Sequence, residues 1–137
     1  MTAPLLDTHA WIWWIQADAR LGKPTIAALD ALAPDDRPSV PAICLWEVAM
    51  LVNLGRLDLG ESLRSWLDAA ADSRTAHVLP ITPAIANEVA RIPESMHRDP
   101  ADRLIIATAR VHDLPVLTRD QAIRRSKLVT LWSQRAA

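Results

Sequence analysis

The chain has 137 residues, half of them hydrophobic and 23% charged, which is typical of a single globular domain and not of a disordered segment. No apolar run approaches the length of a membrane span, and the first ten residues lack the basic and apolar regions of a signal peptide. The single Cys44 excludes an internal disulfide and a cysteine-based zinc site, and it fits a reducing cytoplasm. A net charge of −1 provides no strong overall field for nucleic acid, so such a substrate would need a local basic patch or metal ions.

Short apolar strands alternate with amphipathic helices along the whole chain. The first strand ends at Asp7 and is followed by a turn, and further strands are expected over residues 37–43, 77–82, 114–118 and 128–132. Apolar residues at helical spacing predict helices over residues 25–32, 43–55, 60–72, 83–92, 99–113 and 119–126. We expect one α/β domain over residues 1–137, with a parallel sheet covered by helices on both faces. In such folds, functional sites form beyond the carboxyl ends of the strands.

Two aspartates open the helix that is predicted from residue 99 onwards. Asp99 occupies the N-cap position, and Asp102 falls at the third helical position, as in a capping box. Asp102 also shares a helix face with Ile105 and Ile106, which should pack on the core. A carboxylate at the edge of a core is unfavourable unless a positive group meets it, so Asp102 is a candidate for a site as well as a cap.

Three further acids stand where a site is expected. Asp7 ends the first strand, and Asp120 follows the strand over residues 114–118 by two residues. For both, capping of the next helix and a role in a site remain open. Thr118 can orient a carboxylate or a water molecule, or it can bond the backbone. Glu47 is the only charge in the apolar run "ICLWEVAMLV", and because charged residues are seldom buried without a partner, we favour a site.

In a parallel sheet these four acids can meet at one edge. Four neighbouring carboxylates would repel one another unless divalent cations neutralised them. Ligation by oxygen alone suits Mg²⁺ or Mn²⁺, and carboxylate-bound Mg²⁺ commonly acts on phosphates.

The order of the acids resembles that of the PIN-domain ribonucleases, and the VapC toxins of bacterial toxin–antitoxin pairs are the nearest match. The motifs are Asp7 in "LLDTHAWIWW", Glu47 in "ICLWEVAML", Asp102 in "DPADRLIIATA" and Asp120 in "LPVLTRD". No single motif is specific for this family, but the four motifs in this order are specific for it when taken together. The resemblance extends from about Leu5 to Trp132.

This resemblance implies a three-layer α/β/α fold and an endoribonuclease that depends on Mg²⁺ or Mn²⁺. It implies that Asp7, Glu47, Asp102 and Asp120 are both catalytic residues and metal ligands. Asp99 matches an additional acid of one subgroup and is a further candidate ligand, although capping can account for it. The resemblance also implies a homodimer, an RNA substrate, a cytoplasmic location, no membrane association, and a small VapB-like antitoxin that blocks the site.

Several other residues are candidates for contact with RNA. His9 lies near Asp7 and can touch substrate, donate a hydrogen bond or pack. Arg103 and Arg98 lie beside the proposed acids and can bind the RNA backbone. His97 could join a mixed His/Asp metal site, an interpretation that no H-x-x-x-H pair supports. Four tryptophans can stack RNA bases, although packing is the more frequent role: Trp11, Trp13, Trp14 and Trp46.

Two alternatives lie outside the nucleases. A receiver-like signalling domain is also a parallel α/β domain with acidic strand ends, but it needs a lysine after a late strand, and Lys23 and Lys127 are poorly placed. A non-catalytic α/β interaction module is physically possible, but it leaves Glu47 unexplained. The three glycines form neither a dinucleotide-binding motif nor a P-loop.

Overall fold

The computed structural model describes residues 3–94 and 99–133. Four short strands form one sheet in the order β3-β2-β1-β4, and every pairing is parallel. The strands are β1 (Leu5–Leu6), β2 (Ser39–Pro41), β3 (His77–Leu79) and β4 (Val116–Leu117). The predicted parallel sheet is therefore confirmed.

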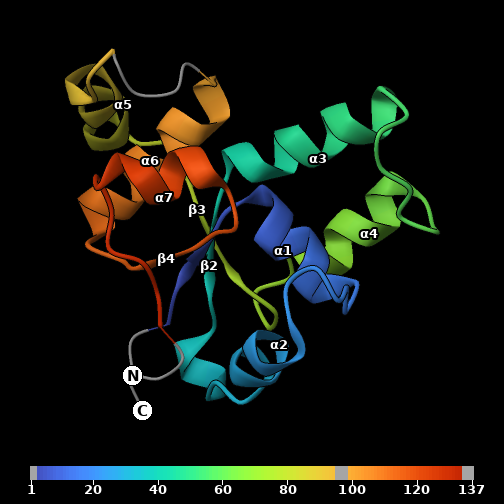
Figure 1. The fold of residues 1–137 in the computed structure, drawn as a ribbon. Coiled ribbons are helices and arrows are strands. Elements are labelled where there is room, and N and C mark those ends of the chain that lie inside the picture. The colour runs from blue at the N-terminus through green and yellow to red at the C-terminus, as the bar shows by residue number, and fades with distance from the viewer. Residues whose placement is uncertain (1–2, 95–98, 134–137) are drawn as a thin grey trace.

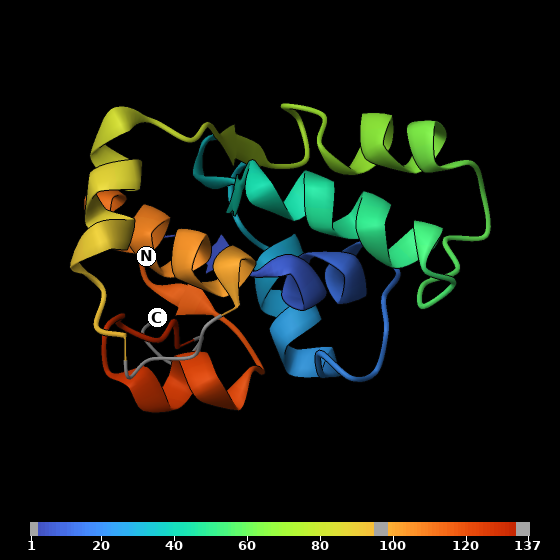
Figure 2. The same ribbon diagram turned by 90° about the horizontal axis from the view of Figure 1, so that it is seen from above.

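Helices fill the connections between the strands. They are α1 (Thr8–Ile15), α2 (Lys23–Asp30), α3 (Ile43–Asn53), α4 (Leu63–Ala70), α5 (Pro83–Arg91), α6 (Pro100–His112) and α7 (Gln121–Ser126), with a short 3-10 helix at Pro34–Asp36. In the views of Figure 1 and Figure 2, α5, α6 and α7 lie to one side of the sheet, and α1, α2 and α4 lie to the other. Helix α3 contacts α1, α4 and α6 and so links the two groups. This arrangement is the expected three-layer α/β/α fold.

The strand order places a topological switch point beside β1. The chain runs from β1 to β2 and β3 on one side, and it then returns so that β4 pairs with the other side of β1. Side chains that follow β1 and β4 therefore meet where the connections diverge, which is the usual place for a site in an open parallel sheet.

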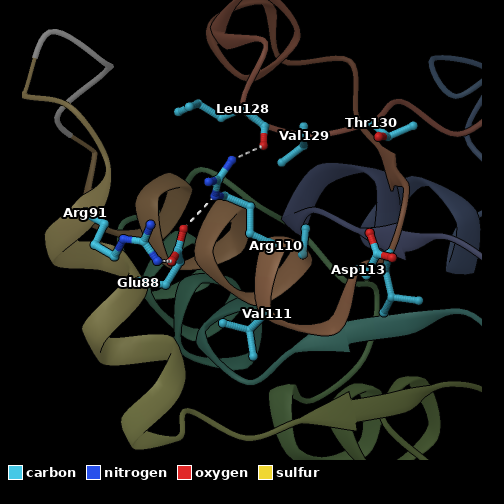
Figure 3. A pocket seen from close by; sticks show the side chains of 10 residues that line it. Glu88, Arg91, Arg110, Val111, Asp113, Leu128, Val129 and Thr130 are labelled. Carbon is cyan, nitrogen blue, oxygen red and sulfur yellow. Dashed lines mark hydrogen bonds and ion pairs between the residues drawn. The ribbon is translucent and has the colours of Figure 1, made fainter.

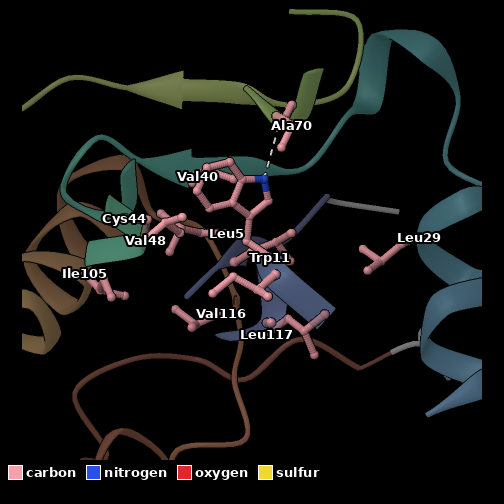
Figure 4. Close-up of a cluster of buried hydrophobic side chains, with 14 of the residues drawn as sticks. Leu5, Trp11, Leu29, Val40, Cys44, Val48, Ala70, Ile105, Val116 and Leu117 are labelled. Atoms are coloured by element: carbon pink, nitrogen blue, oxygen red, sulfur yellow. Dashed lines mark hydrogen bonds between the residues drawn. The ribbon is translucent and has the colours of Figure 1, made fainter. Parts of the chain in front are cut away.

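A large apolar cluster surrounds the sheet (Figure 4), and a second, smaller cluster packs α5, α6 and α7 together. Leu5, Leu6 and Trp11 are fully buried in the large cluster. The indole N–H of Trp11 donates to the carbonyl of Ala70 at 3.1 Å, and its ring meets that of Trp66 edge-on at 5.0 Å. A buried Trp needs such a partner for its N–H, so α4 is fixed against α1.

The structure differs from the expected elements at two places. The segment after Asp7 is helix α1 and not only a turn, because the Asp7 side chain accepts the N–H of Ala10 and starts a helix in an aromatic-rich stretch. The expected strand over residues 128–132 is a single parallel bridge between Val116 and Leu131. Strand β4 has only two residues, so it offers little edge for a longer ladder. Among the described residues, no helix is long and apolar enough to cross a membrane.

Candidate active site

Asp7 lies between β1 and α1 and is almost completely buried. One carboxylate oxygen, Oδ1, accepts the backbone N–H of Ala10 at 2.9 Å. The other, Oδ2, accepts the hydroxyl of Thr118, which is fully buried beyond the end of β4. Burial raises the pKa of Asp7, and these two hydrogen bonds only partly oppose that effect. Asp7 can therefore cap α1 with one oxygen and belong to a site through the other.

The Thr118 hydroxyl joins the two strand-end acids. Besides donating to Asp7, it accepts the backbone N–H of Asp120 at 2.9 Å. Asp120 caps α7 through Oδ1, which accepts the N–H of Ile123 at 3.0 Å. In the sequence Thr118 lies beside Asp120. In the structure its hydroxyl also bonds Asp7, which follows the neighbouring strand β1.

Glu47 projects from the middle of α3 and is half-buried. Its Oε1 accepts a hydrogen bond from the hydroxyl of Thr8, the first residue of α1. Because α1 begins directly after β1, this bond brings Glu47 to the same end of the sheet as Asp7. Thr8 was not predicted as a site residue, because its partner Glu47 lies 39 residues away and no local pattern links the two.

The start of α6 supplies two more acids with different positions. Asp99 is the N-cap, and its Oδ1 accepts the N–H groups of Ala101 at 2.8 Å and Asp102 at 3.2 Å. The pKa of Asp102 is raised to about 7, first by burial and then by the charges of Asp99, Asp120, Glu47 and Asp7. The neighbouring acids therefore reach Asp102 electrostatically, as expected for a convergent cluster.

These side chains surround a pocket of about 230 Å³ at the carboxyl end of the sheet. Its lining consists of Asp7, Thr8, His9, Trp13, Glu47, Asp102, Arg119 and Asp120. All four acids that the sequence selected are present, and so is His9. Trp13 is one of the four tryptophans considered for stacking on RNA bases, whereas Thr8 was not selected as a site residue.

Arg119 ties the pocket to the first turn of α2 and to the segment before it. Its Nη2 donates to the carbonyl of Leu21 at 2.6 Å and to the hydroxyl of Thr25 at 3.2 Å. The loop between β4 and α7, which carries Asp120, is thereby anchored to a different part of the chain. A basic residue next to Asp120 was visible in the sequence, but its anchoring partners were not.

Asp99, Arg103 and Thr118 are candidates that do not line the pocket, although Thr118 bonds Asp7, which does. Asp99 acts as a helix cap, and Arg103 donates to the carbonyls of Ile92 at 2.8 Å and Pro93 at 3.2 Å, near the end of α5. A role of Arg103 in RNA binding stays a prediction. His97 and Arg98 lie outside the described residues.

The donors around the pocket suit a hard cation in their chemistry. They are carboxylate oxygens, the ligands that Mg²⁺ and Mn²⁺ prefer. Within the described residues, no three His, Cys, Asp or Glu side chains are already arranged to hold an ion. Asp7 and Glu47 are instead held by the hydroxyls of Thr118 and Thr8. The donor set therefore fits a divalent metal.

A larger pocket of about 410 Å³ lies away from these acids (Figure 3). There Glu88 of α5 bonds Arg110 of α6 at 2.6 Å and Arg91 at 3.3 Å. Arg110 also donates to the carbonyl of Leu128 at 2.8 Å. Arg110 lowers the pKa of Glu88 through this hydrogen bond. Because the network joins α5, α6 and the C-terminal segment, we regard it as a structural clamp.

A parallel α/β/α domain with four acids around one pocket at the divergence of β1 and β4 defines the class of this protein. Residues 5–127 match the family model described as PIN domain. The chain is 36% identical over 135 residues to Ribonuclease VapC22 of Mycobacterium tuberculosis (strain ATCC 25618 / H37Rv), an alignment that covers 96% of this chain and 100% of that protein. The chain therefore belongs to the PIN-domain family and is of the VapC type.

Solved structures agree with this assignment. The crystal structure of FitAcB from Neisseria gonorrhoeae is similar, with a TM-score of 0.67 and 25% identity, and covers 97% of this chain and 99% of that one. A toxin–antitoxin complex from Klebsiella pneumoniae shares the fold, with a TM-score of 0.60 and 21% identity over 86% of this chain and 87% of that one. The strand order also differs from the 2-1-3-4-5 order of receiver domains, so the receiver-like interpretation is rejected.

Proposed function

We propose that this chain is a divalent-metal-dependent endoribonuclease and the toxin of a toxin–antitoxin pair. The observation that carries the proposal is the common pocket of Asp7, Glu47, Asp102 and Asp120, which come from four separate parts of the chain. Its relative from Mycobacterium tuberculosis bears the name ribonuclease, and the matching Klebsiella structure is a toxin–antitoxin complex. A silent interaction module would have no use for acids gathered so closely that Asp7, Glu47 and Asp120 raise the pKa of Asp102.

In this proposal Asp7, Glu47, Asp102 and Asp120 hold Mg²⁺ or Mn²⁺, and Asp99 remains a further candidate ligand. When bound, such an ion can activate water and neutralise developing charge at a phosphate. Thr118 positions Asp7 relative to Asp120, and Thr8 positions Glu47. These hydroxyls limit the freedom of the acids, as partners of metal ligands commonly do.

The remaining parts of the proposal concern partners and location. A small VapB-like antitoxin would cover the pocket, and the toxin would form a homodimer in the cytoplasm. Light scattering of the purified chain tests the homodimer. Co-expression with the protein encoded beside it, followed by RNA cleavage with and without that protein, tests the antitoxin.

Cleavage of a panel of structured RNAs in the presence of Mg²⁺, Mn²⁺ or a chelator tests the central proposal. Cleavage should require the ion and should disappear in Asp7→Asn. Asp68→Asn is the matched control, because Asp68 is exposed on α4 and pairs only with Arg64 in the described contacts. Cleavage that persists equally in Asp7→Asn and Asp68→Asn would assign the activity to a contaminant and refute the proposal.

A further inference from the structure

The pocket has an aromatic wall in addition to its acids. His9 and Trp13 both line it, and they stand four residues apart on α1, so they share one helix face. Their ring centroids are 5.5 Å apart with an angle of 48° between the planes. His9 is exposed, whereas Trp13 is half-buried. The same short helix therefore presents Asp7 at its start and two rings just beyond it.

Trp13 is held in place by a cation. The guanidinium of Arg20 lies 5.1 Å from the centroid of the Trp13 ring, and Arg20 is itself bonded to Asp18 at 2.7 Å. Arginine over an indole is a favourable cation–π arrangement. Because the ring is already fixed, a ligand that stacks on this wall loses less conformational entropy than one that must order a free side chain.

The neighbouring tryptophans have other roles. Trp11 is fully buried in the core. Trp14 donates its indole N–H to the carboxylate of Asp30 at 2.9 Å. Trp13 alone of these three lines the pocket of the acids. The packing role that is frequent for tryptophan thus accounts for Trp11 and only partly for Trp13.

We infer that His9 and Trp13 form a stacking wall for a base of single-stranded RNA, next to the phosphate that faces the acids. The inference rests on the proposed ribonuclease function and assigns the two side chains that contact a base at this site. Aromatic side chains stack on bases that are free of a duplex, and such contacts tolerate any base. A ribose-phosphate chain that places one phosphate at the acids would bring the adjacent base to the rings of the same small pocket.

Fluorescence anisotropy with two labelled oligomers of equal length tests the inference. One is a single-stranded RNA of mixed sequence, and the other is its abasic counterpart, with the same sugars and phosphates. Binding is measured with Ca²⁺ present in place of Mg²⁺, and a gel checks that the RNA stays intact. The variants are Trp13→Leu, Trp13→Phe and His9→Gln, with Trp46→Leu as the control, because Trp46 is 55% exposed and does not line the pocket.

Wild type should bind the RNA more tightly than the abasic oligomer. Trp13→Leu should reduce this preference by about fivefold or more, because the variant lacks the aromatic ring on which a base stacks. Its affinity for the abasic oligomer, which has no base to stack, should be unchanged. Trp13→Phe should restore most of the preference, His9→Gln should lower it, and Trp46→Leu should match wild type.

Two results would overturn the inference while leaving the nuclease intact. One is RNA cleavage by wild type with no preference for the oligomer that carries bases. The other is an equal loss of affinity for both oligomers in Trp13→Leu, which would indicate a structural role. If wild type neither binds nor cleaves RNA, the proposed function fails and this inference fails with it.

Discussion

Replacement of Asp102 by Asn should stabilise the metal-free protein, and the gain should depend on pH. The pKa of Asp102 is raised from an ordinary value of 3.8 to about 7 in the folded state. Between these values the folded protein holds a proton on Asp102 that the unfolded chain has released. The stability of wild type therefore falls as pH rises from about 4 to about 7 and is then level. Asn carries no charge, so Asp102→Asn does not lose stability in this way as the pH rises.

The size of the effect follows from the same pKa. A shift of one pKa unit corresponds to about 1.36 kcal/mol. A rise in the pKa of Asp102 from 3.8 to about 7 therefore amounts to about 4 kcal/mol in the free energy of unfolding. Asp102 is only half-buried, and solvent screening reduces this to about 2 kcal/mol. For a domain of this length, that is a rise of roughly 6 °C in Tm.

Thermal melts followed by circular dichroism, in chelator and across this pH range, measure the difference. Asp102→Asn should melt with wild type near pH 4 and roughly 6 °C above it near pH 8. Asp113→Asn is the matched control at the other end of α6, where the residue is exposed and has a φ of 52° that Asn also adopts well. Added Mn²⁺ should stabilise wild type more than Asp102→Asn. If wild type and Asp102→Asn melt at the same temperature at every pH, burial and the neighbouring acids do not destabilise the charged form of Asp102. That result would refute the reasoning.

Four other substitutions test separate parts of the structure. Asp99→Asn should leave both Tm and RNA cleavage nearly unchanged, because Asn also caps helices; a loss of cleavage as large as in Asp102→Asn would make Asp99 a ligand. Glu47→Gln keeps the oxygen that accepts from Thr8, so melts should show an intact fold, while cleavage assays should show most activity lost; full activity would remove Glu47 from the site. Thr8→Val removes that hydroxyl and should weaken Mn²⁺ binding by about tenfold in calorimetric titration, and unchanged binding would deny Thr8 a positioning role. Glu88→Gln should lower Tm above the ordinary carboxylate pKa and not in acid, because the lowered folded pKa of Glu88 contributes stability that disappears as pH falls; a loss independent of pH would point to packing instead.

Local patterns in the sequence were sufficient for most elements and for the selection of Glu47 and Asp102. For Asp7 and Asp120 they left capping and a site open, and the resemblance to the PIN-domain family favoured a site. The alternation of strands and helices predicted the parallel sheet, and the apolar run around Glu47 marked a charge that needed a partner. The start of α6 is also as expected, since Asp99 caps it while Asp102 shares a face with the buried Ile105 and Ile106. Each of these inferences depends on residues within one helix or strand, where spacing determines which side chains are neighbours.

Contacts between distant segments could not be predicted in this way. Thr118 and Asp7 are separated by 111 residues, and Arg119 reaches Leu21 over 98. The clamp at Glu88 likewise depends on a partner 22 residues along the chain. For Thr118 and Arg119 the partner is determined by how the strands are ordered in the sheet, and for Glu88 it is determined by the packing of α5 against α6. No local pattern encodes either arrangement.

The structure also shows which local contacts favour the gathering of four acids around one pocket. Asp7, Asp102 and Asp120 all lie at starts of helices, where free backbone N–H groups favour a negative charge. Asp7 and Asp120 use one carboxylate oxygen each for an N–H of the helix that follows. Glu47 lies in the middle of a helix, where no such donors are free, and the Thr8 hydroxyl serves instead. Capping thus lowers the free energy of gathering the acids, and a divalent ion would have to neutralise only the repulsion that remains, such as that of Asp7, Glu47 and Asp120 on Asp102.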